Sequence, residues 1–334
     1  MWKPCAIALC LMANSALADQ KLVNSALDYH ILPAFETLAT ETVTLAETTA
    51  AHCSPDSPEL RAAYGRAFDA WVNVSHLRFG PSEEEDRAFA LAFWPDTKGF
   101  TPKALNRLIA AKDPIVFDPV DFATLSVAGR GFYALEFLLF DEAFSQEDTA
   151  DYRCDLVRAI AQEIHRNANG IAIDWKTYQD ALRTPAQDGL YKTDEEALRE
   201  VFKALLTGLQ FTSDTRLGRP LGTFDRPRPR RAEARRSERS LRHVDQSLAS
   251  TYALALILSE DQPMIRKSLV LAFDRALELA RDLDDPSFAG VADPAGRFRV
   301  EVLQNAVDRI REIATLELAP ALGVSSGFNA LDGD

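Results

Sequence analysis

Apolar residues recur at helical spacing along most of the chain. In residues 21–51 the apolar positions predict one long amphipathic helix, and they are Leu22, Leu27, Ile31, Phe35, Leu38, Val43 and Leu45. The same reasoning predicts helices at 59–79, 83–93, 102–111, 121–140, 148–182, 194–216, 230–258, 263–284 and 294–317. Strand-like alternation does not recur, and no hairpin signal is present. The sequence therefore predicts an all-α protein.

Breaks in the periodicity indicate how the helices are grouped. Pro33 falls inside the first predicted helix and is expected to kink it or to lie near its first turn. Residues 184–192, TPAQDGLYK, form a clear break, and we expect the domain boundary there. This predicts two helical bundles joined end to end, at 19–186 and 187–320. An aperiodic tail follows at 321–334.

The segment with the most unusual chemistry is residues 121–140, DFATLSVAGRGFYALEFLLF. Read as one helix, it places Arg130, Tyr133 and Glu136 on one face, because residues three apart are neighbours on a helix surface. Its two glycines each weaken it by about 1 kcal/mol relative to alanine. A carboxylate in an apolar helix beside such glycines indicates close approach by another backbone or a ligand. The alternative is a core helix in which Glu136 is paired with an arginine.

The first 18 residues resemble a secretory signal peptide. Lys3 supplies a minimal charged region, CAIALCLM a short apolar region, and residues 16–18, Ala-Leu-Ala, fit a cleavage site before Asp19. The alternatives are a retained anchor and a lipoprotein signal ending at Cys10, although the apolar run is too short to span a bilayer. We therefore expect an exported, periplasmic mature chain that begins near Asp19.

Cysteine usage fits this expectation. Cys5 and Cys10 would leave with the signal peptide, so Cys53 and Cys154 would remain as an even pair in an oxidising compartment. A disulfide between them is a candidate, but the sequence does not test its geometry. The chain has no CxxC, no haem-attachment CxxCH and no paired-cysteine zinc spacing.

Composition and charge limit the kinds of molecule that the protein is expected to bind. The 334 residues are 47% hydrophobic and 26% charged, as in globular proteins, with a formal net charge of −13. That balance argues against nucleic acid as the main partner. Yet ten arginines and no lysine lie between Arg216 and Arg242. Such a strip suits an acidic partner, lipid headgroups or an anionic ligand, or it is a solvated helix face. We also expect no transmembrane helix in the mature chain.

Few residues carry recognisable catalytic chemistry. No two of the five histidines stand four apart on one predicted helix, and there is no HExxH, GxSxG or catalytic-cysteine pattern. Hydrolase activity is therefore not favoured. His76 stands next to the Arg78 turn, and a binding site formed by His76, Asp96 and Glu136 is conceivable.

Five short stretches resemble the imelysin-like family of bacterial periplasmic and surface proteins. Residues 77–81, LRFGP, are similar to the family's RFGP turn, and residues 93–96, FWPD, to its WPxD segment. Residues 131–139, GFYALEFLL, resemble its GxHxxE motif, and 218–222 and 236–240, GRPLG and RSERS, resemble its GxPLG loop and the serine-rich start of the next helix. Their order and spacing match over essentially the whole mature chain.

The resemblance implies a fold of two helical bundles with a ligand site at the inter-domain cleft. Its lining would include Glu136, Tyr133, Arg78, Asp96, Arg130, Gly131, Arg239 and Ser240. Members were first classed as metallopeptidases, and many are linked instead to iron uptake. The implied function is an exported binding protein in iron or metal acquisition, with a periplasmic or membrane-bound iron-transport or redox partner. The alternatives are a metal-free interaction or scaffold protein and, third, a metallopeptidase.

One departure from the family motif bears on the metal. Gly131 and Glu136 are kept, but Tyr133 occupies the histidine position. A phenol with a pKa near ~10 must lose its proton to become a ligand, so the exchange weakens a zinc or ferrous site. It suits a ferric ion, or else Tyr133 hydrogen-bonds Glu136 or a ligand and metal binding is lost. Arg239 and Ser240 align with a family motif, and we expect at least one to face the cleft and pair with Glu136.

Overall fold

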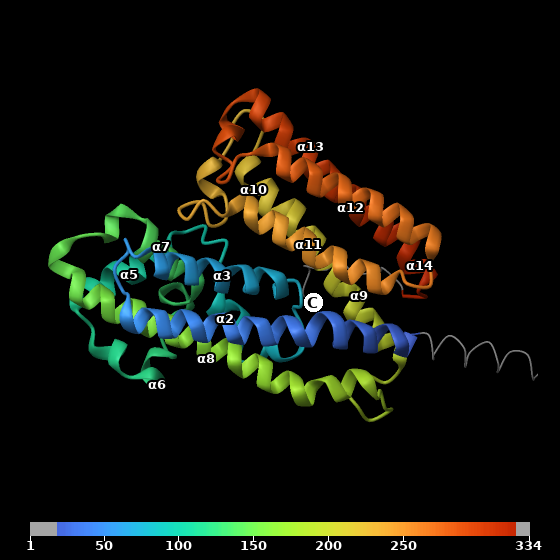
Figure 1. Cartoon of the computed structure of the whole chain (residues 1–334), viewed down its shortest axis with the longest axis horizontal. Coiled ribbons are helices and arrows are strands. Elements are labelled where there is room, and N and C mark those ends of the chain that lie inside the picture. Colours follow the sequence, from blue (N-terminus) through green and yellow to red (C-terminus); the bar gives the residue numbers. More distant parts are fainter. Residues whose placement is uncertain (1–18, 325–334) are drawn as a thin grey trace, which may run out of the picture.

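The computed structural model describes residues 19–324, and its regular elements in that range are helical (Figure 1). Helical residues from 19 onward continue into the π-helical turn η1 (Leu27–Ile31). The helices that follow are α2 (Leu32–Ala51), α3 (Pro58–Val74), α4 (Arg87–Leu91), α5 (Phe100–Ala111), α6 (Pro119–Phe122), α7 (Gly131–Phe140), α8 (Ala150–Arg183), α9 (Asp194–Gln210), α10 (Gly218–Leu221), α11 (Ser240–Leu258), α12 (Pro263–Leu283), α13 (Pro294–Ile313) and α14 (Ala319–Ala321). The predicted all-α class is confirmed. The predicted signal peptide and residues 325–334 of the predicted tail lie outside the described residues.

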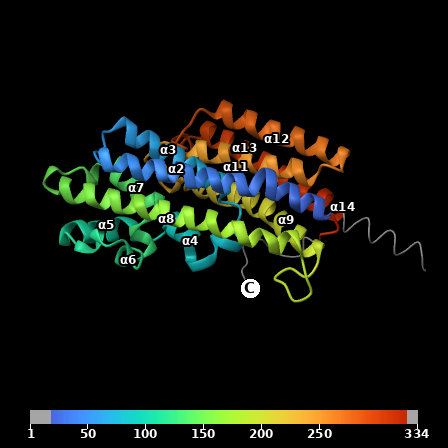
Figure 2. The same ribbon diagram turned by 60° about the horizontal axis from the view of Figure 1, so that its bottom comes forward.

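The helices pack in two groups that meet along α3 and α11. In the first group α2 packs against α3 and α8, and α7 packs against α8; in the second α12 contacts α11 and α13, and α9 contacts both of these. Figures 1 and 2 both show α2 and α8 side by side along their length. The predicted boundary at 184–192 coincides with the loop between α8 and α9. That these groups are separate domains stays a prediction.

Large apolar side chains fill the interior of both groups. Phe35 of α2 and Trp175 of α8 are fully buried and stack with ring centroids 5.5 Å apart. Burying a side chain of this size stabilises the fold by about 1.5–3 kcal/mol. The long first helix is continuous, as predicted, and η1 lies directly before Pro33. Since proline excludes a regular hydrogen bond to the preceding turn, a π-helical turn accommodates it without ending the helix.

The prediction of one helix across 121–140 is wrong. The chain forms α6, a 3₁₀ turn η5 (Val127–Gly129) and an extended Arg130, and α7 begins only at Gly131. Gly131 has φ +75°, and a Cβ there would collide with the carbonyl oxygens of Ala90 and Leu91 at the end of α4. The close approach expected beside Glu136 is therefore made by the α4 backbone. It also removes Arg130 from the face that carries Tyr133 and Glu136.

Three other predicted helices are shorter than expected. Helix α3 ends at Val74 rather than at residue 79, α4 covers only Arg87–Leu91, and α11 begins at Ser240 rather than at residue 230. Residues 229–239 instead form a 3₁₀ turn η9 (Pro229–Arg231) and an irregular segment with positive φ at Ala234 and Glu238. We call residues 229–239 the arginine loop. Figure 1 shows it between α10 and α11, on the side that faces α3 and α7.

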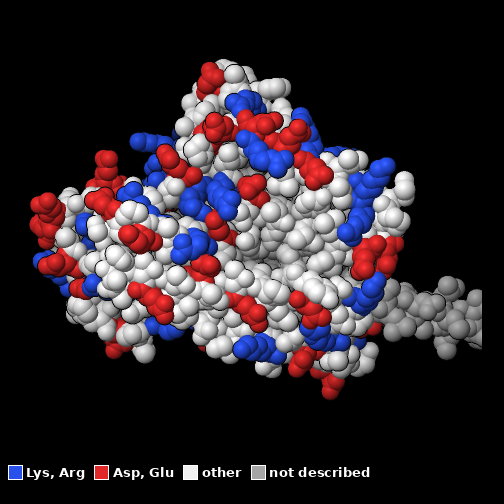
Figure 3. All heavy atoms as spheres, in the orientation of Figure 1, with Lys and Arg blue, Asp and Glu red and all other residues white. Residues whose placement is uncertain are grey.

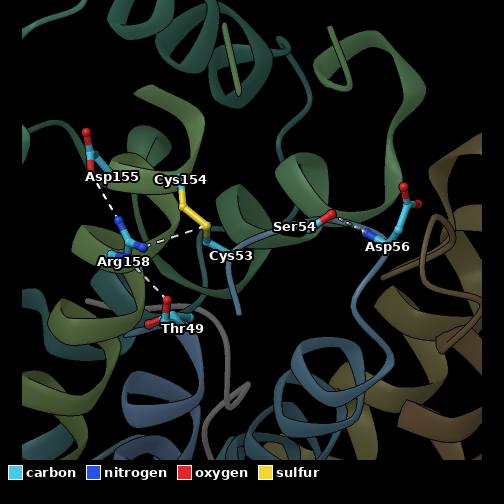
Figure 4. Close-up of a disulfide and its surroundings, with 7 residues drawn as sticks. All are labelled: Thr49, Cys53, Ser54, Asp56, Cys154, Asp155 and Arg158. Carbon is cyan, nitrogen blue, oxygen red and sulfur yellow. Dashed lines mark hydrogen bonds and ion pairs between the residues drawn. A yellow bond between two sulfur atoms is a disulfide. The ribbon is translucent and has the colours of Figure 1, made fainter. Parts of the chain in front are cut away.

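A disulfide ties the end of α2 to α8 (Figure 4). The structure joins Cys53 to Cys154, with Cα atoms 5.1 Å apart and a sequence separation of 101. Arg158, one turn further along α8, donates to the carbonyl of Thr49 at 3.3 Å and contacts Cys53 Sγ at 3.8 Å. The pairing that the sequence left open is thus the one found.

The distribution of charged side chains on the surface bears on which partners the protein can bind. On the face drawn in Figure 3, basic and acidic side chains are interspersed, and a largely uncharged area lies right of centre. Across residues 19–324, no helix combines the length and apolarity needed to cross a bilayer.

Candidate functional site

Two neighbouring cavities share a wall formed by Trp94 and Tyr133. The larger, about 520 Å³, has rings of six aromatic residues in its lining, and we call it the aromatic cavity; they are Trp71, Phe79, Phe89, Trp94, Tyr133 and Phe211. The smaller, about 320 Å³, is the arginine cavity. Its charged lining residues are Asp96, Glu136, Arg219, Arg230, Arg231 and Arg236.

Helix α7 places two of the predicted site residues at these cavities. Tyr133 and Glu136 are three residues apart, so they lie on adjacent turns of one face. Tyr133 borders both cavities, whereas Glu136 borders the arginine cavity. Both are buried, Glu136 with 2% of its surface exposed. Phe68 of α3 packs edge-on against the Tyr133 ring and fixes its position.

Glu136 is held by the arginine loop. Its Oε1 accepts hydrogen bonds from the backbone N–H of Ser237 at 3.0 Å and from the Ser237 hydroxyl at 2.8 Å. Burial raises the pKa of Glu136 above its usual value, even though both Ser237 bonds favour the ionised form. The expected pairing of Glu136 with Arg239 or Ser240 is wrong. Arg239 turns onto α3 instead, where it binds Asp69 and the carbonyl of Gly65.

Tyr133 belongs to a buried network centred on Glu233. Its hydroxyl donates to Glu233 Oε1 at 2.5 Å, and Arg216 Nε donates to Glu233 Oε2 at 2.7 Å. His243 Nδ1 lies 3.3 Å from Glu233 Oε2, a close approach without the alignment of a hydrogen bond. The Ser240 hydroxyl donates to the Glu233 carbonyl. The network connects α7, η8 (Phe211–Leu217), the arginine loop and α11.

Burial and the neighbouring groups determine the protonation states of Glu233 and Tyr133. Burial alone raises the pKa of Glu233, but Arg216, His243 and the Tyr133 hydroxyl outweigh it and lower the pKa to about 2. Burial and the neighbouring Glu233 charge raise the pKa of Tyr133 well above 10.0. Tyr133 thus keeps its proton, and its hydroxyl donates a hydrogen bond to Glu233 rather than to Glu136. Sequence reasoning missed Glu233; its one signal was that it is one of three acids among ten arginines.

Asp96 and His76 do not share a site. Asp96 borders the arginine cavity, and its oxygens accept from the backbone N–H groups of Phe100 at 2.9 Å and Thr101 at 2.8 Å at the start of α5. His76 borders the aromatic cavity, and its Nε2 lies 2.9 Å from Nε2 of His30. Burial lowers the pKa of His30 to about 4 and that of His76 well below 6.5. The conceivable site of His76, Asp96 and Glu136 is therefore not formed.

The remaining predicted site residues have structural partners. Arg78 borders the aromatic cavity and pairs with Glu83 at 2.5 Å. Arg130 pairs with the buried Glu163 of α8 and borders neither cavity. Gly131 permits the contact with α4 described above.

The arginine cavity carries positive charge that the described chain does not neutralise. Within residues 19–324, Arg219, Arg230 and Arg231 form no ion pair, and Arg219 Nε is buried without a hydrogen-bond partner. Burial and the neighbouring charge of Arg231 lower the pKa of Arg219. Arg236 is the exception, since it pairs with Asp141 at 2.6 Å and stacks on Phe137. Three arginines held together with no carboxylate at ion-pair distance favour an anion, although Asp96 and Glu136 line the same cavity.

The donor set does not fit a bare metal cation. No group of three or more histidine, cysteine, aspartate or glutamate side chains is arranged to hold a metal within the described part of the chain. Tyr133 keeps its proton, and Asp96 is occupied by backbone N–H groups. The three arginines without an ion pair outnumber the two lining carboxylates, Asp96 and Glu136, so the cavity also disfavours a free cation. The cavity fits an anion, including a metal ion that arrives inside an anionic complex.

Comparison with known proteins places this fold. Among solved structures, an imelysin-like protein from Psychrobacter arcticum 273-4 superposes with a TM-score of 0.78 at 20% identity, covering 94% of this chain and 98% of that one. A protein from Parabacteroides distasonis ATCC 8503, described as an iron-regulated protein A precursor, gives 0.73 at 12% identity, with 91% and 95% covered. At these identities the likeness shows the fold alone. A comparison with curated proteins finds no match. The sequence model of the Imelysin family matches residues 31–314, and the chain therefore belongs to that family.

Proposed function

We propose that the protein is an exported, non-catalytic binding protein in iron acquisition, which takes iron as an anionic complex in the arginine cavity. One observation carries the proposal: Arg219, Arg230 and Arg231 line a cavity of about 320 Å³ and have no carboxylate partner within residues 19–324. Guanidinium groups bind carboxylate and phosphate in a planar, two-pronged geometry. Ferric ions are commonly carried by polycarboxylates, whose complexes are anionic and present such groups.

Two further observations support the link to iron and to export. The description of the Parabacteroides distasonis neighbour names that protein as iron-regulated and as a precursor. The chain's own first 18 residues have the pattern of a secretory signal, and the disulfide between Cys53 and Cys154 suits an oxidising compartment such as the periplasm. A periplasmic or membrane-bound iron-transport or redox partner would accept the cargo.

A second candidate is a metal-free interaction protein. It is favoured by the exposure of Arg226, Arg228, Arg230 and Arg231, of which Arg230 and Arg231 also line the arginine cavity. In that case the strip would dock an acidic protein. The metallopeptidase alternative has no such observation in its favour.

Calorimetric titration of the mature, disulfide-bonded protein tests the leading proposal. We expect ferric citrate and citrate to bind, and free ferrous ion to bind at least ~10-fold more weakly, since the cavity is cationic. Arg219→Gln should weaken citrate binding by about 10-fold, as expected for one lost charged hydrogen bond. Arg226→Gln, an exposed arginine outside both cavities, is the matched control. The iron proposal fails if ferric citrate does not bind.

A further inference from the structure

The two cavities differ in which groups of their lining are available to bind a ligand. In the aromatic cavity Arg78 pairs with Glu83 at 2.5 Å and Arg216 with Glu233 at 2.7 Å, while Glu200 and Lys203 contribute one charge of each sign to the lining. Apart from these two opposite charges, what remains available there is ring surface. In the arginine cavity three of the four guanidinium groups, those of Arg219, Arg230 and Arg231, have no ion-pair partner within residues 19–324, and only Arg236 is paired, with Asp141. One half of the site therefore offers apolar contact and the other offers charge.

The shared wall brings these two properties together. Trp94 and Tyr133 stack with ring centroids 6.2 Å apart and 26° between their planes. The Arg219 guanidinium lies 5.6 Å from the centre of the Trp94 ring, and Phe211 packs edge-on to Trp94 at 5.9 Å. An unneutralised cation therefore stands beside the aromatic surface that leads into the larger cavity.

We propose that the natural ligand is an organic anion with an aromatic body, whose ring occupies the aromatic cavity while its carboxylate or similar group binds Arg219 and Arg231. This deepens the proposed function and rests on it, because both place the anionic group of the ligand in the arginine cavity. The aromatic cavity's volume of about 520 Å³ lies in the range usual for pockets that bury small organic ligands. An inorganic anion or citrate would fill only the arginine cavity.

The size and placement of the rings explain why an aromatic body fits best. Phe89 is 46% exposed at the cavity edge, whereas Trp71 and Phe79 are buried deeper in the lining. Ring surface of this kind gains from offset or edge-on stacking with another ring, beyond the gain from area alone. A flexible aliphatic chain would gain the area without the stacking.

Three metal-free probes test the inference: naphthoate, acetate, which has the charge without the ring, and naphthylmethanol, which has the ring without the charge. Calorimetry on the mature protein should show naphthoate binding at least ~10-fold more tightly than either other probe, because it uses both halves of the site. Arg219→Gln should weaken naphthoate about 10-fold and leave naphthylmethanol unchanged. Phe89→Ala should weaken naphthoate and naphthylmethanol alike and leave acetate unchanged.

Two control variants and two contradicting results complete the test of the aromatic ligand. Arg226→Gln and Phe100→Ala change an exposed arginine and a half-exposed ring outside both cavities, and should alter none of the three affinities. The inference is overturned if acetate binds as tightly as naphthoate, or if Phe89→Ala leaves naphthoate binding intact. If one of these results is found and ferric citrate still binds, only the inference of an aromatic ligand fails and the iron proposal stands. If naphthoate behaves as expected and no iron complex binds, the iron proposal falls and the ligand class stands.

Discussion

The hydroxyl of Tyr133 donates a hydrogen bond to Oε1 of Glu233 at 2.5 Å, across 100 residues of sequence. Through this bond Tyr133 holds the arginine loop against α7. Because Glu233 is also bonded to Arg216, the loop that supplies Arg230, Arg231 and Arg236 of the cationic lining is anchored at its buried acid. Tyr133 is thus a positioning residue for the arginine cavity.

Tyr133→Phe should destabilise the protein by about 1.5–3 kcal/mol, since it leaves a buried, charged acceptor without one donor. Urea denaturation followed by circular dichroism measures this. Tyr252→Phe removes an exposed hydroxyl bond to Asp274 at 3.3 Å and should cost under about 0.5 kcal/mol. Equal losses in the two variants would show that the Tyr133 bond does not anchor the loop.

Glu233→Gln should cost about 3–5 kcal/mol, because Arg216 would be left as a buried charge without its partner. The pH dependence follows from the same group. Its pKa is about 2 in the folded protein against 4.5 ordinarily, so its contribution is complete above pH 4.5 and is lost as the pH falls toward 2. Unfolding free energies measured across this window should fall less steeply in the variant than in the parent protein.

The His30–His76 pair should make the protein acid-sensitive at a higher pH. The pKa of His30 is lowered from 6.5 to about 4, so the unfolded chain binds its proton first and stability is lost as the pH falls from 6.5 to 4. For His30 alone this amounts to about 3 kcal/mol. His30→Gln keeps a group that can hydrogen-bond His76 and should flatten that part of the curve. An unchanged slope would contradict the assignment.

Gly131→Ala should be more damaging than its size suggests. The positive φ alone costs about 1–2 kcal/mol for a residue with a Cβ, and the collision with α4 adds to it. Gly323 offers a matched control, since it has φ +70° with nothing within 4 Å of its Cβ position. Thermal unfolding should show Gly131→Ala losing at least about twice the stability lost by Gly323→Ala. Similar losses would mean that α4 moves aside without cost.

The fold class followed from sequence because helical periodicity is a local property. Where predicted helices had the wrong bounds, the cause was a tertiary contact, which a local sequence pattern does not encode. The helix expected across 121–140 is interrupted after Phe122, and α7 begins at Gly131, where the close α4 backbone leaves no room for a Cβ. The helix expected from residue 230 begins at Ser240 because Glu136 takes the backbone N–H of Ser237, which a helix would have used internally.

The site itself was only partly predictable for the same reason. Tyr133 and Glu136 could be chosen because an acid and a phenol stand out in an apolar helix. Their partners could not, since Glu233 and Ser237 lie about 100 residues away. Arg239, chosen by its place in a family motif, points to Asp69 instead. The arginine-rich composition of 216–242 was visible, but which arginines would lack a carboxylate partner depended on the fold.

The most direct measurement is anomalous diffraction at the iron edge from crystals of the mature protein soaked in ferric citrate. The account predicts a single iron peak in the arginine cavity, on the side of Glu136 that faces Arg219 and Arg231, with no direct ligation by Tyr133. An iron atom bound directly to the Tyr133 oxygen or to His76, or no iron in either cavity at saturating complex, would contradict it.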